Sequence, residues 1–351
     1  MSDNSKNFQQ QVEQALKNKT ALSIHGAGSH DFLLGDYAEP ETIDLTSHHG
    51  IIDYQPSELT LTARAGTPLN DIRIALAEHH QRLPTDFPQH NDAATLGGAI
   101  AIGHSGSGRP FLGAIRDHVL GVHLLTGTGE AVRCGGQVMK NVAGYDVSRL
   151  LAGSRGTLGI LLDITLKVLP APQQQITLAF DLDENRAIRQ MNELAGRSLP
   201  INACAYVNGQ MLLRLEGTES GVAAAKQKLG GETLTASSAL WDSLQRQTHD
   251  FFQPEPALWR IIVPATAPRL ELENEHQSLI DWCGGLRWIH AIEVTQSDFI
   301  HISNLGGTLE SYRGAAPTRP QDLMTALQRD MQQRIQRAFD PANIFNPALS
   351  I

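Results

Sequence analysis

Glycine is concentrated in the first half of this chain. Of the 31 glycines among 351 residues, twenty lie between Gly26 and Gly159. Glycine is favoured where the backbone turns with positive φ or approaches a ligand closely, because it has no Cβ. This distribution predicts a first half built from turns that cradle a cofactor, followed by an ordinary α+β second half.

Length and charge exclude several classes of protein. A chain of this length corresponds to about two domains, and 41% apolar with 19% charged residues is typical of a folded protein. The 28 Lys and Arg against 37 Asp and Glu give a formal charge of −9, and there is no basic run. Nucleic acid is not expected as a partner, because phosphate binding requires clustered basic residues.

The expected location is the cytoplasm. Cys134, Cys204 and Cys283 are far apart in the sequence and form no C-x-x-C motif, so no disulfide framework and no zinc or iron–sulfur site is expected. So few cysteines suit a reducing compartment. The polar N-terminus lacks a secretory pattern, and no stretch approaches the roughly 20 apolar residues of a membrane span. Peripheral attachment at the inner membrane through partners is compatible with this sequence.

Hydrophobic spacing and turn residues predict the helices, the strands and the domain boundaries. In the first half they predict a helix at 7–18, a helix that opens at Thr67-Pro68 with Thr67 as its cap, and strands at 21–24, 58–65, 118–126, 130–134 and 160–169. Residues 92–113 show no clear period. A β-α-β-β-α-β order over 176–235, with Asp183 as a helix cap, predicts a ferredoxin-like unit, and a weaker alternation follows at 257–264 and 284–291. We expect domains at 1–172 and 173–318, and a segment 319–351, helical over 320–339, that packs on the first domain.

The common nucleotide-binding loops are absent. There is no G-x-x-x-x-G-K-[ST] motif and no complete G-x-G-x-x-G motif between a strand and a helix. The sequence instead contains dispersed glycine turns, and successive N–H groups in such turns form a concavity that can bind a pyrophosphate. Any single loop of this type is more often a plain turn, but the whole series in this order favours a binding site.

The order of the turns resembles the FAD-binding domain of the vanillyl-alcohol oxidase and p-cresol methylhydroxylase type. The similarity is carried by the loop at 25–29, by ATLGGAIA at 94–101, RDHVLG at 116–121, GYD at 144–146, GSRGTLGI at 153–160 and IFNP at 344–347. It implies an α+β fold with a two-subdomain FAD-binding domain and a ferredoxin-like α+β cap. The C-terminal segment would return to the FAD domain.

The resemblance also implies which residues bind FAD. The first phosphate loop and two further contact regions would be formed by His25, Gly26, Ala27, Gly28 and Ser29, by Thr95, Gly97, Gly98 and Gly103, and by Gly153, Ser154, Gly156 and Ile160. Asn346 would lie near the flavin ring, and Lys140 could add a positive charge. Some relatives attach flavin covalently through a histidine of the first loop. Ser29 stands at that position here, so non-covalent FAD is expected.

A narrower resemblance is to the FAD-binding subunits of glycolate oxidases. It is carried by GGQVMKNVAGYD at 135–146, by Trp259-Arg260, and by LIDW at 279–282 with LRW at 286–288. It implies a bacterial complex of this chain with a catalytic flavin subunit and an iron–sulfur subunit. Such a complex oxidises a small 2-hydroxy acid, glycolate, to glyoxylate and passes electrons towards the respiratory chain. The sequence does not choose between glycolate and lactate.

The sequence departs from that of a self-sufficient enzyme in its histidines. Catalytic relatives carry a His-rich cap motif with an acidic residue that binds a divalent metal, and no H-x-H or H-E-x-x-H motif occurs here, so no metal is expected. The pairs His48-His49 and His79-His80 are expected to face solvent. The sequence assigns no catalytic residue, and three hypotheses about the function remain open. These are an active FAD-dependent 2-hydroxy-acid dehydrogenase, an accessory flavoprotein that docks the other subunits, and a scaffold that has lost FAD.

Overall fold

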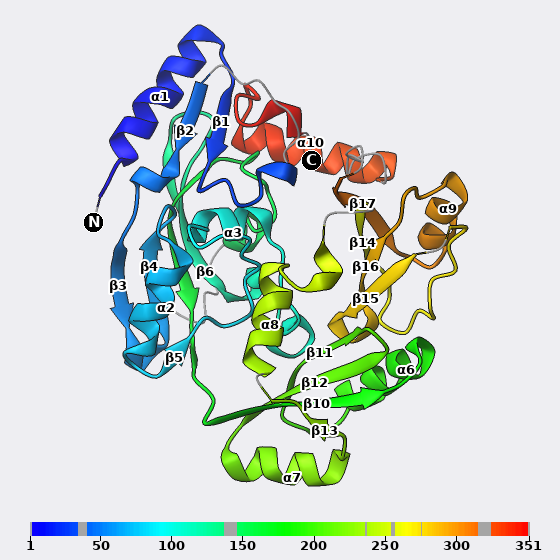
Figure 1. The fold of residues 1–351 in the computed structure, drawn as a ribbon. Helices are drawn as coiled ribbons and strands as arrows, with labels where there is room; N and C mark the ends of the chain where they lie inside the picture. Colours follow the sequence, from blue (N-terminus) through cyan, green and yellow to red (C-terminus); the bar gives the residue numbers. More distant parts are fainter. Residues whose placement is uncertain are drawn as a thin grey trace. The chain divides into compact units, whose positions relative to one another are not determined.

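The computed structural model describes residues 2–33, 41–136, 146–235, 237–253, 257–274, 276–314 and 324–349. The chain forms two compact units, whose elements are labelled in Figure 1. Unit 1 comprises Met1–His104, Ala114–Ala171 and Met324–Ile351, and unit 2 comprises Ser105–Gly113 and Pro172–Leu323. The glycine-rich stretch 92–113 is therefore divided between the two units.

Unit 1 is built on a five-stranded antiparallel sheet with the strand order β3-β4-β8-β6-β7. The pairs β1-β2 and β5-β9 form two smaller sheets. The predicted helix at 7–18 and the five predicted strands are confirmed to within a few residues. The elements are α1 (Ser5–Asn18), β1 (Leu22–His25), η1 (Asp31–Leu33), β2 (Glu41–Asp44), η2 (Leu45–Ser47), β3 (Ile51–Gln55), η3 (Pro56–Glu58), β4 (Thr60–Arg64), α2 (Leu69–Ala77), β5 (Gln81–Arg82), α3 (Leu96–Ile102), η4 (Ile115–His118), β6 (Val119–Leu125), β7 (Ala131–Gly135), α5 (Val147–Leu150), β8 (Ile160–Lys167), β9 (Leu169–Pro170), α10 (Ala326–Phe339) and η8 (Pro347–Leu349).

The C-terminal segment extends the small sheet of β1 and β2. The Leu22 amide donates to the Ile344 carbonyl at 2.7 Å, and the Asn346 amide donates to the Leu22 carbonyl at 3.0 Å. Phe8 and Val12, one turn apart on α1, pack with Leu22 and with Phe345, which is fully buried. Residues from both ends of the chain therefore share one hydrophobic core in unit 1.

Two local predictions in unit 1 are wrong. Thr67 does not cap α2, because Pro68 is the residue that precedes the helix. The Thr67 hydroxyl instead donates to the Arg64 carbonyl at 2.7 Å and accepts from the Gly50 amide at 2.9 Å. His48 does not face solvent: its side chain is fully buried, accepts from the Asn4 amide at 3.0 Å and lies 3.1 Å from the Leu162 carbonyl. His49 is exposed, as expected.

Unit 2 contains an eight-stranded sheet with the order β13-β10-β12-β11-β15-β16-β14-β17. The predicted β-α-β-β-α-β order is confirmed over β10 to β13, and Asp183 caps α6 by accepting from the Arg186 amide at 2.9 Å. The sequence did not predict β15, β17, α8 or α9. The elements are α4 (Arg109–Leu112), β10 (Gln174–Asp181), α6 (Glu184–Ala195), β11 (Ile201–Val207), β12 (Gln210–Gly217), α7 (Glu219–Leu229), β13 (Glu232–Thr233), α8 (Ser237–Arg246), η5 (Asp250–Phe252), β14 (Leu258–Ile262), β15 (Gln277–Asp281), η6 (Trp282–Gly284), β16 (Leu286–His290), α9 (Gln296–Asn304) and β17 (Thr308–Arg313).

The two faces of this large sheet differ in chemistry. One face packs mostly apolar side chains, such as Leu178, Leu213 and Ile280, against α6 and α7, and it also carries Arg287, which is paired with Ile280 and is 1% exposed. The opposite face carries buried charges: Arg260 is paired across the strands with Glu310 on one side and with Trp288 on the other. Because directly paired residues of neighbouring strands point to the same face, these side chains form one polar cluster.

Residues 105–113 are an integral part of unit 2. The Trp282 indole donates to the Gly106 carbonyl at 2.9 Å, and the Ser107 hydroxyl donates to the buried Asp281 carboxylate at 2.9 Å. The Arg109 guanidinium lies 4.2 Å from the centroid of the Trp282 ring. These contacts tie a segment from the glycine-rich first half of the chain to the sheet of unit 2.

Two of the three cysteines lie close together in unit 2. Although they are 79 positions apart in the sequence, Cys204 and Cys283 meet in the core of unit 2 with their Sγ atoms 2.9 Å apart, and all three cysteines are free thiols. Among the described residues, no helix combines the length and the apolar character that crossing a membrane requires.

Candidate cofactor-binding site

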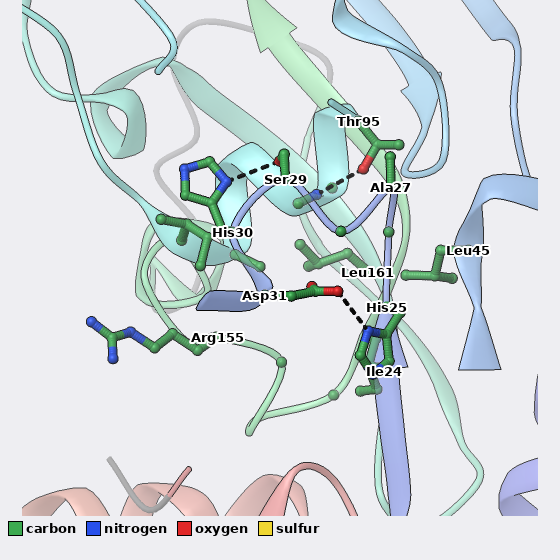
Figure 2. Close-up of a pocket in the computed structure, with 18 residues that line it drawn as sticks. Ile24, His25, Ala27, Ser29, His30, Asp31, Leu45, Thr95, Arg155 and Leu161 are labelled. Carbon is green, nitrogen blue, oxygen red and sulfur yellow. Dashed lines mark hydrogen bonds and ion pairs between the residues drawn. The ribbon is translucent and has the colours of Figure 1, made fainter. Parts of the chain in front are cut away.

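A cavity in unit 1 opens beside the loop that follows β1 (Figure 2). It contains about 670 Å³ of empty space, part of which is open to solvent. Its wall is formed by the loop, by the first turn of α3 and by the turn before β8, and it consists of Ile24, His25, Gly26, Ala27, Gly28, Ser29, His30, Asp31, Leu45, Thr95, Gly97, Gly98, Ala101, Ile102, Arg155, Gly156, Gly159 and Leu161.

The loop at 26–30 offers unpaired backbone donors. The amides of Ala27, Gly28, Ser29 and His30 donate to no backbone carbonyl in the described part of the chain. Gly28 has φ +70°, a conformation that strongly favours glycine, and a Cβ at Gly26 would lie 2.7 Å from the Thr95 hydroxyl oxygen. Successive amides that turn around a concavity attract an anion. The loop can therefore hold a phosphate group without a lysine.

The first turn of α3 is fixed by side-chain and backbone contacts. Thr95 precedes the helix, and its hydroxyl accepts from the Gly98 amide at 3.2 Å. The Gly97 amide donates to the Ala65 carbonyl at 2.7 Å, and a Cβ at Gly97 would lie 2.7 Å from the Ala65 Cβ. Glycine at position 97 therefore lets α3 lie directly against the backbone that follows β4, which places Thr95 at the cavity wall.

The turn before β8 is held against the end of α3. The Gly153 amide donates to the Ile100 carbonyl at 3.0 Å, and the Arg155 amide donates to the Ala101 carbonyl at 2.8 Å. A Cβ at Gly103, which has φ +70°, would lie 2.7 Å from the Gly153 nitrogen. This close backbone packing positions Arg155 and Gly156 at the cavity.

Asn346 joins the C-terminal segment to both walls of the cavity. Its Oδ1 accepts from the Ile24 amide at 2.9 Å, and its Nδ2 donates to the Arg155 carbonyl at 2.9 Å. The residue is 6% exposed, and a Cβ at Gly156 would lie 2.7 Å from its Nδ2. Asn346 therefore fixes the backbone of β1 and of the 155–156 turn, and it is not among the residues that line the cavity.

The structure brings most of the predicted residues to one cavity. Nine of them line it, namely His25, Gly26, Ala27, Gly28, Ser29, Thr95, Gly97, Gly98 and Gly156. The other five, Gly103, Gly153, Ser154, Ile160 and Asn346, do not. Gly103 and Gly153 pack against each other, Ser154 accepts from Thr157 through its carbonyl, and Ile160 is fully buried in the core beneath α1. Lys140 lies outside the described residues.

Several lining residues were missed by the sequence analysis. His30 and Asp31 directly follow the glycine loop, and Arg155 lies inside the GSRGTLGI segment with φ +51°. Of the described residues that line the cavity, Arg155 is the one lysine or arginine. Their closeness to the glycine turns was the available signal, and only the structure shows that their side chains reach the same cavity.

Two histidines of the loop have different environments. The ring of His25 lies 3.7 Å from the Asp31 carboxylate through Nδ1 (Figure 2), and its Nε2 lies 2.6 Å from the Ser23 hydroxyl. Burial, together with the nearby His90 and Arg155, lowers the pKa of His30 to about 3. His30 is therefore a neutral imidazole in the folded protein, whereas His25 is paired with a carboxylate.

Comparison with known proteins places the chain in a family. A family model described as an FAD binding domain matches residues 3–135. The chain is 40% identical to glycolate oxidase subunit GlcE of Escherichia coli (strain K12), over 98% of this chain and 97% of that protein. It is 24% identical to glycolate oxidase subunit GlcD of Bacillus subtilis (strain 168), over 85% of this chain and 76% of that protein.

One solved structure has a fold similar to that of this chain. Alkyldihydroxyacetonephosphate synthase matches 97% of this chain and 74% of its own with a TM-score of 0.65 at 15% identity. The FAD-binding match includes the loop at 26–30 and the first turn of α3, which together form much of the cavity wall. FAD is therefore the cofactor, and the chain belongs to the family of the glycolate oxidase subunit GlcE.

Proposed function

We propose that this chain is the FAD-carrying subunit of a multisubunit glycolate oxidase that converts glycolate to glyoxylate. The two relatives named above are both subunits of glycolate oxidases, and one of them matches almost the whole chain. In this proposal unit 1, with the C-terminal segment paired to β1, is the FAD domain, and unit 2 is the cap.

The observation that carries the proposal is the set of unpaired amides beside the cavity. Ala27, Gly28, Ser29 and His30 line the cavity, and their amides donate to no backbone carbonyl among the described residues. Such donors suit the pyrophosphate of FAD, and Arg155 adds a positive charge to the same wall. Oxidation of a 2-hydroxy acid releases two electrons and two protons: bound FAD would supply the acceptor for both electrons and one proton, and the hydroxyl proton would pass to solvent.

The residues of this chain hold and shield the cofactor. The loop amides would bind the phosphates, Thr95 and Gly97 fix the wall beside the loop, and Leu45 and Leu161 give the same cavity apolar lining. Among the described residues we assign no general base. The proposed partners are a catalytic flavin subunit and an iron–sulfur subunit, which would receive the electrons. We propose the cytoplasm as the location, with these partners as the route to the inner membrane.

A second candidate is an accessory subunit that binds FAD but does not oxidise substrate. Two histidines of unit 2 favour it, because they make hydrogen bonds within the fold. His290 lies 2.6 Å from the Phe251 carbonyl through Nε2, and His249 accepts from the Phe251 amide through Nδ1 at 3.1 Å. No group of three or more His, Cys, Asp or Glu suited to a metal occurs among the described residues.

The test is a visible absorption spectrum of the purified single chain under anaerobic conditions, before and after glycolate is added. Flavin bands that bleach with glycolate, but not with buffer alone, would support an active flavoenzyme. Flavin bands that persist would favour the accessory subunit, and adding the partner subunits should then restore bleaching. A chain that carries no flavin and binds none when FAD is added would overturn both candidates. D-lactate in place of glycolate tests the choice of substrate in the same experiment.

A further inference from the structure

His30 is a buried histidine in the wall of the cavity, directly after the glycine loop. It is 7% exposed, and its Nδ1 lies 3.0 Å from the Ser29 hydroxyl oxygen (Figure 2). Its Nε2 is buried and has no hydrogen-bond partner among the residues that the structure describes. Buried polar atoms in folded proteins almost always have a partner, so an unpaired ring nitrogen at a cofactor cavity indicates that a ligand supplies the missing one.

The surroundings hold the His30 ring in place. The ring of His90 has its centroid 4.5 Å away in an edge contact, and Phe32 and His104 lie at 6.0 and 6.3 Å. Three rings from separate segments therefore limit rotation of the imidazole towards water. The ring cannot relieve its unpaired nitrogen by turning, because turning would also break the contact with Ser29.

The contact with Ser29 fits either neutral tautomer, because the hydroxyl can donate to Nδ1 or accept from it. Burial keeps the imidazole neutral, so it holds a single N–H. When the Ser29 hydroxyl donates to Nδ1, the proton resides on Nε2, and Nε2 becomes a hydrogen-bond donor. A neutral donor can bind an oxygen or nitrogen acceptor without introducing a positive charge into the cavity.

We propose that the Nε2–H of His30 donates a hydrogen bond to an acceptor atom of bound FAD, with Ser29 as the positioning residue whose hydroxyl donates to Nδ1. The inference rests on the proposed function, because it takes FAD as the ligand of this cavity. It assigns the loop two kinds of contact: backbone amides for the phosphates, and one buried side-chain donor that the sequence analysis did not identify.

The experiment compares two carboxamides of different reach. In His30→Gln the amide nitrogen lies near the position of Nε2, whereas in His30→Asn it lies near Nδ1. Flavin is removed from the full chain, and FAD is titrated back into wild type, both variants, Ser29→Ala and the exposed control His49→Gln. We expect the Kd for FAD to rise about tenfold to a hundredfold in His30→Asn, as for a lost hydrogen bond to a ligand, and about threefold to tenfold in Ser29→Ala. His30→Gln should stay within about threefold of wild type, and His49→Gln should be unchanged.

A second measurement separates ligand binding from a structural role. Truncating the packed ring lowers the stability of the flavin-free chain by itself, so the measured quantity is the stabilisation that FAD adds, which should be smaller in His30→Asn than in His30→Gln. Equal FAD affinity in His30→Asn and wild type would overturn the proposal. If His30→Asn does not fold, the Ser29→Ala variant is the test, and an unchanged Kd for FAD in Ser29→Ala would overturn the proposal. A wild-type chain that binds no FAD would instead overturn the proposed function, and the proposed contact between His30 and FAD would fall for the same reason.

Discussion

The cofactor cavity of unit 1 and the polar face of the sheet in unit 2 are built in opposite ways. The cavity wall consists mainly of backbone and small residues, and Arg155 is its one lysine or arginine among the described residues. The polar face of unit 2 consists of buried side chains: Arg260 pairs with Glu310 at 2.8 Å, and its guanidinium lies 5.4 and 5.9 Å from the ring centroids of Trp282 and Trp288.

This difference predicts which kind of substitution destabilises each region. In unit 1 an added Cβ is costly, because main chains lie in contact at glycines such as Gly97 and Gly103. In unit 2 a lost partner is costly, because it leaves a buried charge without compensation. Substitutions at matched positions of the two units therefore test whether the cavity is defined by its backbone.

Gly103→Ala should have the largest effect. The added Cβ would lie 2.7 Å from the Gly153 nitrogen, and the residue would have to keep φ at +70°. Strain and overpacking together should lower the free energy of unfolding by about 4 kcal/mol and displace the turn that carries Arg155, so bound FAD should fall. The matched control is Gly209→Ala, which has φ +80° but no atom within 4 Å, and it should cost about 1 kcal/mol. Urea unfolding measures both, and equal losses would show that contact with Gly153 does not matter.

Glu310→Ala should have the next largest effect, in unit 2. It leaves the Arg260 guanidinium, whose side chain is 9% exposed, without its carboxylate. Removing one partner of a buried pair typically costs about 3 kcal/mol or more. The double variant Arg260→Met with Glu310→Leu should recover most of that loss, because it removes both charges and keeps the volume. A double variant as unstable as Glu310→Ala would mean that packing, and not charge, determines the cost.

Two threonine caps allow a direct comparison of the units. Thr95 accepts from the Gly98 amide and Thr218 accepts from the Gly221 amide, each at 3.2 Å. Thr95→Ala and Thr218→Ala should each cost about 1 kcal/mol in unfolding experiments. Only Thr95 lines the cavity, so only Thr95→Ala should also weaken FAD binding in a fluorescence titration. An equal change in FAD affinity in both variants would show that the effect reaches the cavity through general destabilisation.

Local sequence patterns predicted many of the helices and strands. The features that they did not predict depend on contacts between residues far apart in the sequence. Helix α6, its cap Asp183 and the ferredoxin-like order followed from spacing and turn residues within a few positions of each other. The buried state of His48 depends on residues 44 and 114 positions away, and the Cys204–Cys283 contact spans 79 positions. In the cavity, glycine motifs predicted the backbone, but the reach of His30, Asp31 and Arg155 depends on packing that no local motif encodes.

The smallest expected effect concerns a partly buried carboxylate, Asp163, in the sheet of unit 1. Burial alone would raise the pKa of Asp163, but hydrogen bonds with His48 and His123, whose Nδ1 lies 3.1 Å away, lower it below its ordinary value. A lowered pKa in the folded state means that this carboxylate stabilises the fold above about pH 4 and ceases to do so as the pH falls further. Asp163→Asn should therefore flatten the loss of stability with acid in this window, and the exposed Asp71→Asn should not. Denaturation at a series of pH values measures this, and an unchanged slope in Asp163→Asn would show that acid acts on unit 1 through other groups. Because the partners of Asp163 are imidazoles and not a guanidinium, the change should be smaller than the loss in Glu310→Ala. That ordering would confirm that buried charge contributes less to unit 1 than to unit 2.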